Sequence, residues 1–131
     1  MRSLADLDVP VALRGHHRRC LDAMARLAMA VDDPGGSPAH APGALAARAL
    51  AEVRAATRVL LAARTGAGRN APVTRFLACR LDRLALVADD IAAACAARDT
   101  AALRRGVVRF RALVGAMWKV QLAVGRGTYG G

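Results

Sequence analysis

Prolines and glycines gather in two short stretches that divide the chain into segments. The first stretch, DDPGGSPAHAP at residues 32–42, holds three prolines and two glycines. The second, TGAGRNAP at residues 65–72, holds two glycines and ends in a proline. Proline interrupts a helix because it lacks a backbone N–H and its ring clashes with the preceding turn. We therefore expect the chain to leave a helix at each stretch and to begin another after it.

Apolar residues between these breaks recur at the spacing of one face of an α-helix, about 3.6 residues. We expect helices over residues 10–31, 43–65, 71–97 and 100–125, with Asp99 as the N-cap of the last one. Pro10, Pro42 and Pro72 lie near three helix starts, where a missing N–H costs nothing. Four amphipathic helices with short links predict an all-α fold, an antiparallel up-down-up-down four-helix bundle.

A helical projection assigns most of the large apolar side chains to the inner faces of these helices. Among them we expect burial of Leu50, Leu81, Leu84, Phe110 and Val114, and we place Leu21 on the inner face of the first helix. Leu86 and Cys79 fall outside the inner face of the third helix and form a second strip there. Because an apolar strip on a surface favours self-association, we expect a homo-oligomer, most simply a symmetric homodimer.

Length and composition fit one small helical domain. At 131 residues the chain can bury a core without disulfides or metal. Its hydrophobic content is 55%, much of it alanine, and aromatic residues make up only 3%. An alanine-rich core suits closely packed helices better than a sheet. We expect a single domain over residues 1–131, with flexible ends at about 1–8 and 126–131.

The sequence also carries information about location. The first ten residues, MRSLADLDVP, contain two aspartates and lack the apolar core of a signal peptide. No uncharged apolar run reaches the ~18 residues of a membrane span. The 3 cysteines are widely spaced and odd in number, which argues against a disulfide framework. We expect a cytoplasmic protein without membrane association, and the abundance of Ala, Arg and Gly is typical of a GC-rich bacterial genome.

The net charge of +10 favours anionic partners. Codon bias in a GC-rich genome explains the choice of arginine over lysine, so the charge alone does not identify a partner. Non-specific contact with nucleic acid is one interpretation, and its affinity would depend steeply on salt. However, the sequence has no helix-turn-helix, zinc-finger or RNA-binding aromatic motif.

The stretch RGHHRRCLDAM at residues 14–24 brings two histidines and a cysteine together. The projection turns Cys20 inward with His17 beside it, whereas the arginines of this stretch point outward. A metal site needs three or four converging ligands. Cys95 lies much deeper along its helix, and no carboxylate falls on a predicted core face. We therefore expect no metal site, no cofactor and no catalytic residues.

Six side chains that are unusual for a bundle core fall at similar depths from one end of the predicted bundle. They are Arg80, His17, Thr57, Gln121, Trp118 and Cys20. Arg80 lies between apolar positions of its helix, and a buried guanidinium without a partner costs several kcal/mol, ~3–5. Its head can extend past the rim into water, bond to helix-end carbonyls or a partner subunit, or bind an anion.

In the last case, Thr57, His17 and Gln121 would supply hydrogen bonds to the anion. We therefore predict a small non-catalytic binding or interaction protein for an anionic small molecule or partner. Two alternatives remain open: a basic nucleic-acid-associated protein, and a small helical enzyme acting on an anionic substrate.

Overall fold

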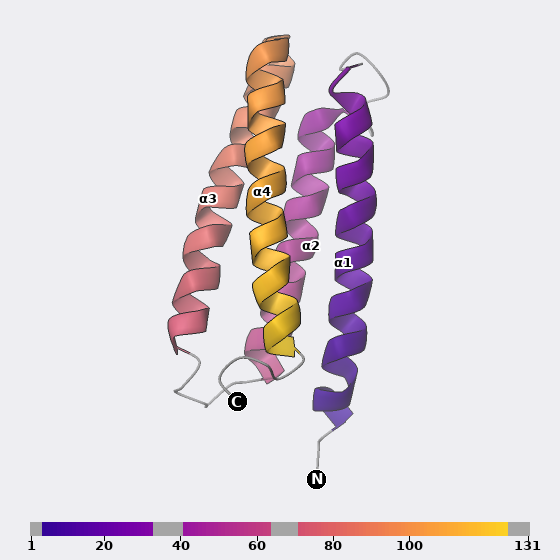
Figure 1. Ribbon diagram of the computed structural model, residues 1–131, viewed down its shortest axis with the longest axis vertical. Helices are drawn as coiled ribbons and strands as arrows, with labels where there is room; N and C mark the ends of the chain where they lie inside the picture. Colours follow the sequence, from indigo (N-terminus) through magenta and orange to yellow (C-terminus); the bar gives the residue numbers. More distant parts are fainter. Residues whose placement is uncertain (1–3, 33–40, 64–70, 126–131) are drawn as a thin grey trace.

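Four helices make up nearly all of the described chain. The computed structural model describes residues 4–32, 41–63 and 71–125. Helix α1 covers Leu4–Ala30, α2 Pro42–Ala63, α3 Ala71–Ala96 and α4 Thr100–Gly125. Successive helices run in opposite directions, α1 and α3 upward and α2 and α4 downward in Figure 1. No strand occurs in these ranges. The predicted all-α four-helix bundle is confirmed.

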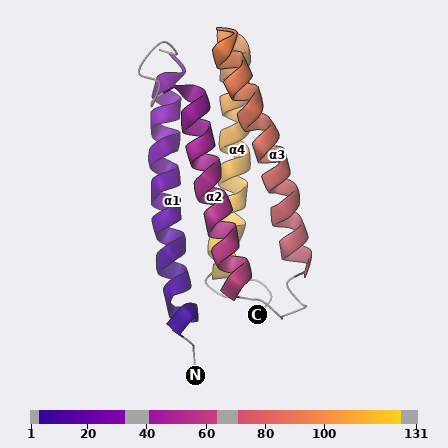
Figure 2. The same cartoon turned by 180° about the vertical axis from the view of Figure 1, so that it is seen from behind.

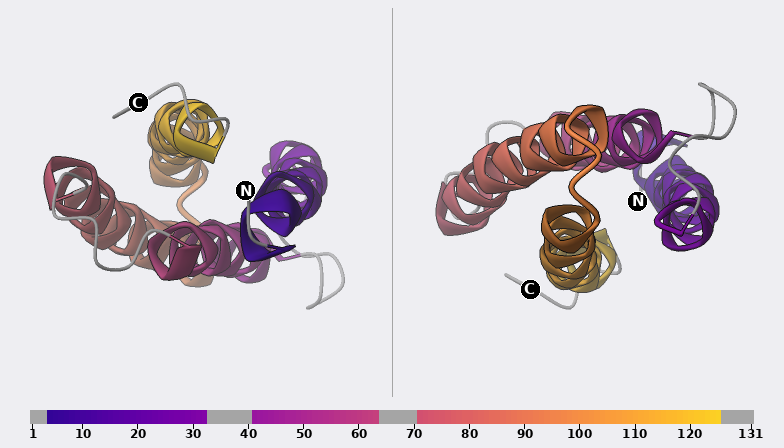
Figure 3. Two further views of the ribbon diagram at one scale, coloured as in Figure 1. Left: turned by 90° about the horizontal axis from the view of Figure 1, so that it is seen from below. Right: turned by 90° about the horizontal axis from the view of Figure 1, so that it is seen from above.

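The bundle is not square in section. Helix α2 packs against all three other helices, whereas α1 and α3 make no contact over their described residues. Helices α2 and α4 therefore meet across the centre, with α1 and α3 on either side, as the end views in Figure 3 show. The N-terminal end of α3 lies apart from the other helices, which is clear from both sides (Figures 1 and 2). Arg80 lies on this diverging end.

The link between α3 and α4 is the best-defined turn. Arg98 adopts a left-handed conformation with φ 56°, and the Asp99 N–H donates to the Ala94 carbonyl at 3.0 Å. This pattern closes a helix in the manner usually reserved for glycine. The Asp99 carboxylate then accepts from the Ala102 N–H at 3.1 Å. The predicted N-cap of the fourth helix is confirmed.

The core follows the predicted faces with two exceptions. Leu50, Leu84, Phe110 and Val114 are buried as predicted. Leu81 is only partly buried, because the buried stripe of α3 runs through Leu77, Leu84 and Ile91 and leaves Leu81 at its margin. The placement of Leu21 in the core was wrong, since its side chain is 51% exposed. Helix α1 has no contact with α3, so its buried stripe is too narrow to include Leu21.

The predicted start of the first helix was also wrong. Helix α1 begins at Leu4, so Pro10 lies inside it. Pro10 is the seventh residue of α1, beyond the first turn, and without an N–H it cannot donate to the carbonyl of residue 6. Of the predicted flexible ends, residues 4–8 are helical, and residues 1–3 and 126–131 lie outside the described ranges. None of the described helical segments combines the length and apolarity of a membrane span.

Candidate functional site

Thr57 and Gln121 join α2 to α4 inside the core. Within the described part of the chain they are the buried polar side chains, 4% and 0% exposed. The Thr57 hydroxyl donates to the Val53 carbonyl at 2.8 Å, and Gln121 Nε2 donates to Thr57 Oγ1 at 3.1 Å. The hydroxyl thus serves as donor and acceptor at once. Most of the hydrogen-bonding groups of these two buried side chains therefore have partners.

His17, Trp118 and Cys20 lie between α1 and α4. The His17 and Trp118 rings have centroids 4.9 Å apart and are tilted by 49°. Cys20 is fully buried, and this burial raises the pKa of its thiol; an interaction with Trp118 offsets part of the rise, and the negative charge of Glu52 adds to it. Cys20 is therefore held as a neutral thiol, which is a poor nucleophile.

Arg80 lies apart from these five residues, at the surface of α3. It is partly exposed, and its guanidinium carbon lies 5.1 Å from the centre of the Phe76 ring. Both residues line an open pocket of about 460 Å³ formed by one helix: Arg75, Phe76, Cys79, Arg80 and Arg83. A cation held over an aromatic face at this distance is attracted by the ring electrons. We call these five residues the arginine pocket.

The contacts divide the six predicted residues into two groups. Five lie on the inner faces of α1, α2 and α4, where four are buried and His17 is partly exposed. Thr57 is bonded to Gln121, and the His17 ring packs against Trp118 at a tilt. We call these five the buried polar cluster: His17, Cys20, Thr57, Trp118 and Gln121. Over the ranges that the structure covers, no hydrogen bond or ion pair joins Arg80 to any of them. A joint site for one anion stays a prediction.

A charged network beside this cluster was not predicted. Glu52, the only glutamate of the chain, lies on α2 with its side chain 19% exposed. Its Oε2 is 2.6 Å from His16 Nδ1, and its Oε1 accepts from Arg19 Nε at 3.0 Å. Arg19 Nη2 also lies 3.0 Å from His16 Nδ1. The Glu52 carboxylate can only accept, so we assign the proton to His16 Nδ1. Arg19 Nη2 then lies close to His16 Nδ1 without a hydrogen bond between them.

This network lowers the pKa of Glu52. Partial burial opposes ionisation, but hydrogen bonds from His16 and Arg19 and the charge of Arg19 outweigh it. A carboxyl group whose pKa is lower in the folded state adds stability above its unfolded pKa. That stability is lost as the pH falls through the folded pKa.

Replacing Glu52 with glutamine should therefore destabilise the protein at neutral pH but hardly at all in acid. We expect a loss of about 1 kcal/mol at pH 7, a value typical of a modest, partly solvated ion pair. The loss should shrink as the pH falls below the ordinary glutamate pKa, about 4.3. Urea unfolding of both proteins at several pH values measures it. An equal difference at every pH would show that shape, and not charge, stabilises this network.

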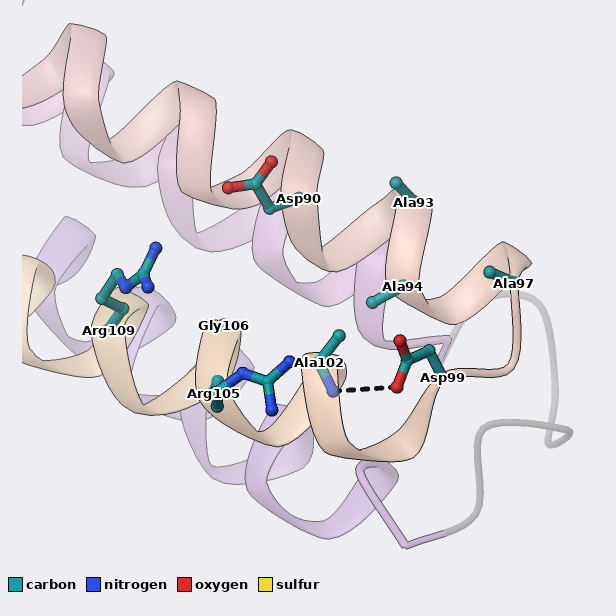
Figure 4. Close-up of a pocket in the computed structure, with 9 residues that line it drawn as sticks. All are labelled: Asp90, Ala93, Ala94, Ala97, Asp99, Ala102, Arg105, Gly106 and Arg109. Carbon is teal, nitrogen blue, oxygen red and sulfur yellow. Dashed lines mark hydrogen bonds between the residues drawn. The ribbon is translucent and has the colours of Figure 1, made fainter.

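A second open pocket, of about 400 Å³, lies between α3 and α4 at the opposite end (Figure 4). Its floor consists of small residues: Ala93, Ala94, Ala97, Ala102 and Gly106. Asp90 lies on α3, Asp99 lies at the turn between the helices, and Arg105 and Arg109 project from α4. A Cβ atom added at Gly106 would come within 3.0 Å of Ile91, so glycine lets α3 and α4 approach closely here. The pocket carries both signs of charge, unlike the arginine pocket.

Comparison with known proteins gives no functional lead, because the chain matches no family model, no curated protein and no solved structure. Over the described residues, no three metal-binding side chains come together. The functional argument therefore depends on the two pockets, the buried polar cluster and the charges around them.

Proposed function

We propose that this chain is a small non-catalytic binding protein for an anionic ligand, bound at the arginine pocket. The observation that carries this proposal is that three guanidinium groups, from Arg75, Arg80 and Arg83, line one pocket. Within the described ranges, none of the three forms an ion pair with a carboxylate. Like charges gathered in this way attract an anion.

Phe76 supports the same proposal. Its ring lies under the Arg80 guanidinium, which restricts the side chain to the pocket. A guanidinium that is already positioned loses less conformational entropy when it binds a phosphate or carboxylate with paired hydrogen bonds. The buried polar cluster is less suited to contact the anion directly. Its unpartnered amide oxygen, Gln121 Oε1, would repel negative charge.

Anion-dependent stability tests this function. We expect phosphate, sulfate or a small carboxylate to raise the unfolding temperature of the wild-type protein at constant ionic strength. Binding to the folded state alone adds about 2.7 kcal/mol at a ligand concentration 100 times the dissociation constant. Arg80→Met should keep the fold, because Arg80 is partly exposed, and should lose most of the anion response. Thermal unfolding across the anion panel measures both effects.

Arg111→Met is the matched control, because Arg111 is exposed on α4 and does not line the arginine pocket. It should retain the wild-type response. Equal responses in the wild-type protein and Arg80→Met would rule out Arg80 as an anion ligand. Binding of duplex DNA that both variants weaken equally, with a steep salt dependence, would instead favour the nucleic-acid alternative.

We also propose a symmetric homodimer through the outer face of α3. Leu86 is 65% exposed and Cys79 is exposed in the single chain. Residues 79, 83, 86, 90 and 93 follow one another at helical spacing and form one stripe on α3, which we call the α3 stripe. If two α3 helices pack antiparallel about Leu86, Arg83 of one copy meets Asp90 of the other, twice. A self-complementary patch of this kind is what a twofold interface requires.

Replacing Leu86 with glutamate should therefore weaken the dimer at least tenfold, since it places a charge at the centre of the interface. Sedimentation equilibrium measures the change. Asp90→Arg should weaken the dimer similarly, and Arg83→Asp added to it should restore association by exchanging the charges. A wild-type protein that stays monomeric at high concentration would contradict the proposal. Because Arg83 belongs to both surfaces, added anions should shift the equilibrium toward the monomer.

A cytoplasmic location remains part of the proposal. All three cysteines, Cys20, Cys79 and Cys95, are free. Free cysteines are typical of proteins in reducing compartments.

A further inference from the structure

Two buried polar atoms of α4 have no hydrogen-bond partner among the described residues. They are Trp118 Nε1, a donor, and Gln121 Oε1, an acceptor. Their residues are 3% and 0% exposed, so bulk water does not reach them. Buried side-chain polar atoms are nearly always paired with protein or with an ordered water. Two unpaired atoms so close in sequence therefore need an explanation.

The hydrogen bonds of Thr57 fix the orientation of the Gln121 amide. A hydroxyl has one proton, and that of Thr57 goes to the Val53 carbonyl. Thr57 Oγ1 can therefore only accept from Gln121, so the amide nitrogen of Gln121 must face it. The amide oxygen then points away from Thr57. Exchanging the two amide atoms would replace the unpaired acceptor with an unpaired donor, so one polar atom of Gln121 would lack a partner either way.

Cys20 does not satisfy the Trp118 indole. The two side chains interact closely enough to lower the pKa of the thiol, but Nε1 and Sγ do not form a hydrogen bond of ordinary geometry. Sulfur is in any case a weak acceptor. The indole N–H is therefore still a donor to a better partner.

We propose that a single water molecule binds in the buried polar cluster, accepting from Trp118 Nε1 and donating to Gln121 Oε1. Trp118 and Gln121 stand three residues apart on α4, so their side chains leave the helix on the same side. A water that accepts one hydrogen bond and donates another can join two polar atoms that do not bond to each other. Buried waters in proteins commonly link polar groups that would otherwise be unpaired.

The polar groups of the buried polar cluster favour an uncharged ligand such as water. Gln121 Oε1 requires a donor, Cys20 is a neutral thiol, and the Thr57 proton is already used. An anion placed here would have no charged partner, and burying an unpaired charge is costly. The water site is thus distinct from the arginine pocket, and the water proposal does not depend on whether the arginine pocket binds an anion.

The sequence makes this site easy to observe by NMR. Trp118 is the only tryptophan and Gln121 the only glutamine, so the indole N–H and the side-chain amide give identifiable signals. We expect cross-peaks between water and the Trp118 indole proton whose NOE and ROE have opposite signs, the signature of long-lived bound water. Thr57→Val and Cys20→Ala should keep these cross-peaks, which excludes relay through the hydroxyl or thiol proton.

Gln121→Leu removes the acceptor and should weaken the cross-peak several-fold. It should also lower the unfolding temperature by a few degrees more than Thr57→Val, which removes only the hydroxyl. If Gln121→Leu does not fold, Gln121→Met replaces it in both measurements. The proposal is overturned by the lack of a long-lived water signal in the wild type. A signal that Gln121→Leu leaves unchanged would also overturn it. So would a higher unfolding temperature for Gln121→Leu, because that would mean Oε1 is unpaired.

Discussion

Replacing Phe110 with alanine should lower the free energy of unfolding by about 3–5 kcal/mol. The Phe110 side chain lies on α4 and is completely buried. Much of the surrounding core consists of short side chains such as Ala49, Ala56 and Ala88, which cannot extend into the space that a lost ring leaves. Because aromatic residues make up only 3% of the chain, this ring supplies an unusual share of the core volume. Urea unfolding followed by circular dichroism measures the loss.

Phe76→Ala is the matched control for Phe110→Ala. Phe76 is the other phenylalanine of the chain, and it is only partly buried on the diverging end of α3. We expect its replacement to cost less than half as much. It should also weaken the anion response, because the Arg80 guanidinium loses the ring beneath it. Equal losses from both replacements would contradict the difference in burial between Phe110 and Phe76.

Trp118→Ala should lower the free energy of unfolding about as much as Phe110→Ala does, by about 3–5 kcal/mol. The Trp118 ring is buried between α1 and α4 and stacks on His17. Its loss removes both core volume and a contact between two helices that are joined less closely than α1 and α2. Urea unfolding followed by circular dichroism again gives the free energy, since fluorescence from the only tryptophan is lost with it.

Trp118→Phe separates the contribution of the aromatic ring to stability from that of the indole N–H. It keeps an aromatic face against His17 and removes only the indole nitrogen and part of the ring system. We therefore expect it to be clearly less destabilising than Trp118→Ala. If both variants lost the same stability, the N–H and not the buried ring would be the stabilising feature of Trp118.

Much of the fold could be predicted from the spacing of apolar residues and the positions of proline and glycine. The breaks at residues 32–42 and 65–72 separate the observed helices, and Asp99 caps α4 as predicted. Local patterns settle these features because helix period and capping depend on near neighbours. The start predicted at Pro10 was wrong because proline favours the first turn of a helix without always marking it, and α1 already begins at Leu4. Leu21 was misplaced because periodicity does not show how many helices a given helix contacts.

The candidate site was predictable only in part. Thr57 pairs with Gln121, and His17 with Trp118, because residues at equal depth on facing helices meet when the helices run parallel to one axis. Arg80 was placed by the same counting, but its side chain is partly exposed over Phe76 on its own helix, and helical periodicity does not show which way a long side chain turns. The network around Glu52 lies at the margin of the α1–α2 contact. A sole glutamate facing a histidine and an arginine one helical turn apart was the only signal for it.

A titration of the ¹⁵N-labelled protein with inorganic phosphate, followed by NMR, tests anion binding at the arginine pocket most directly. We expect saturable shifts of the backbone amides of Phe76, Arg80 and Arg83 and of the Arg80 side-chain Nε signal. The chemical shift of the Trp118 indole N–H should not change, because the buried polar cluster favours an uncharged ligand. In Arg80→Met the amide shifts should require much more phosphate or disappear. Shifts of the indole with α3 unmoved, or shifts on every helix without saturation, would contradict anion binding at Arg80.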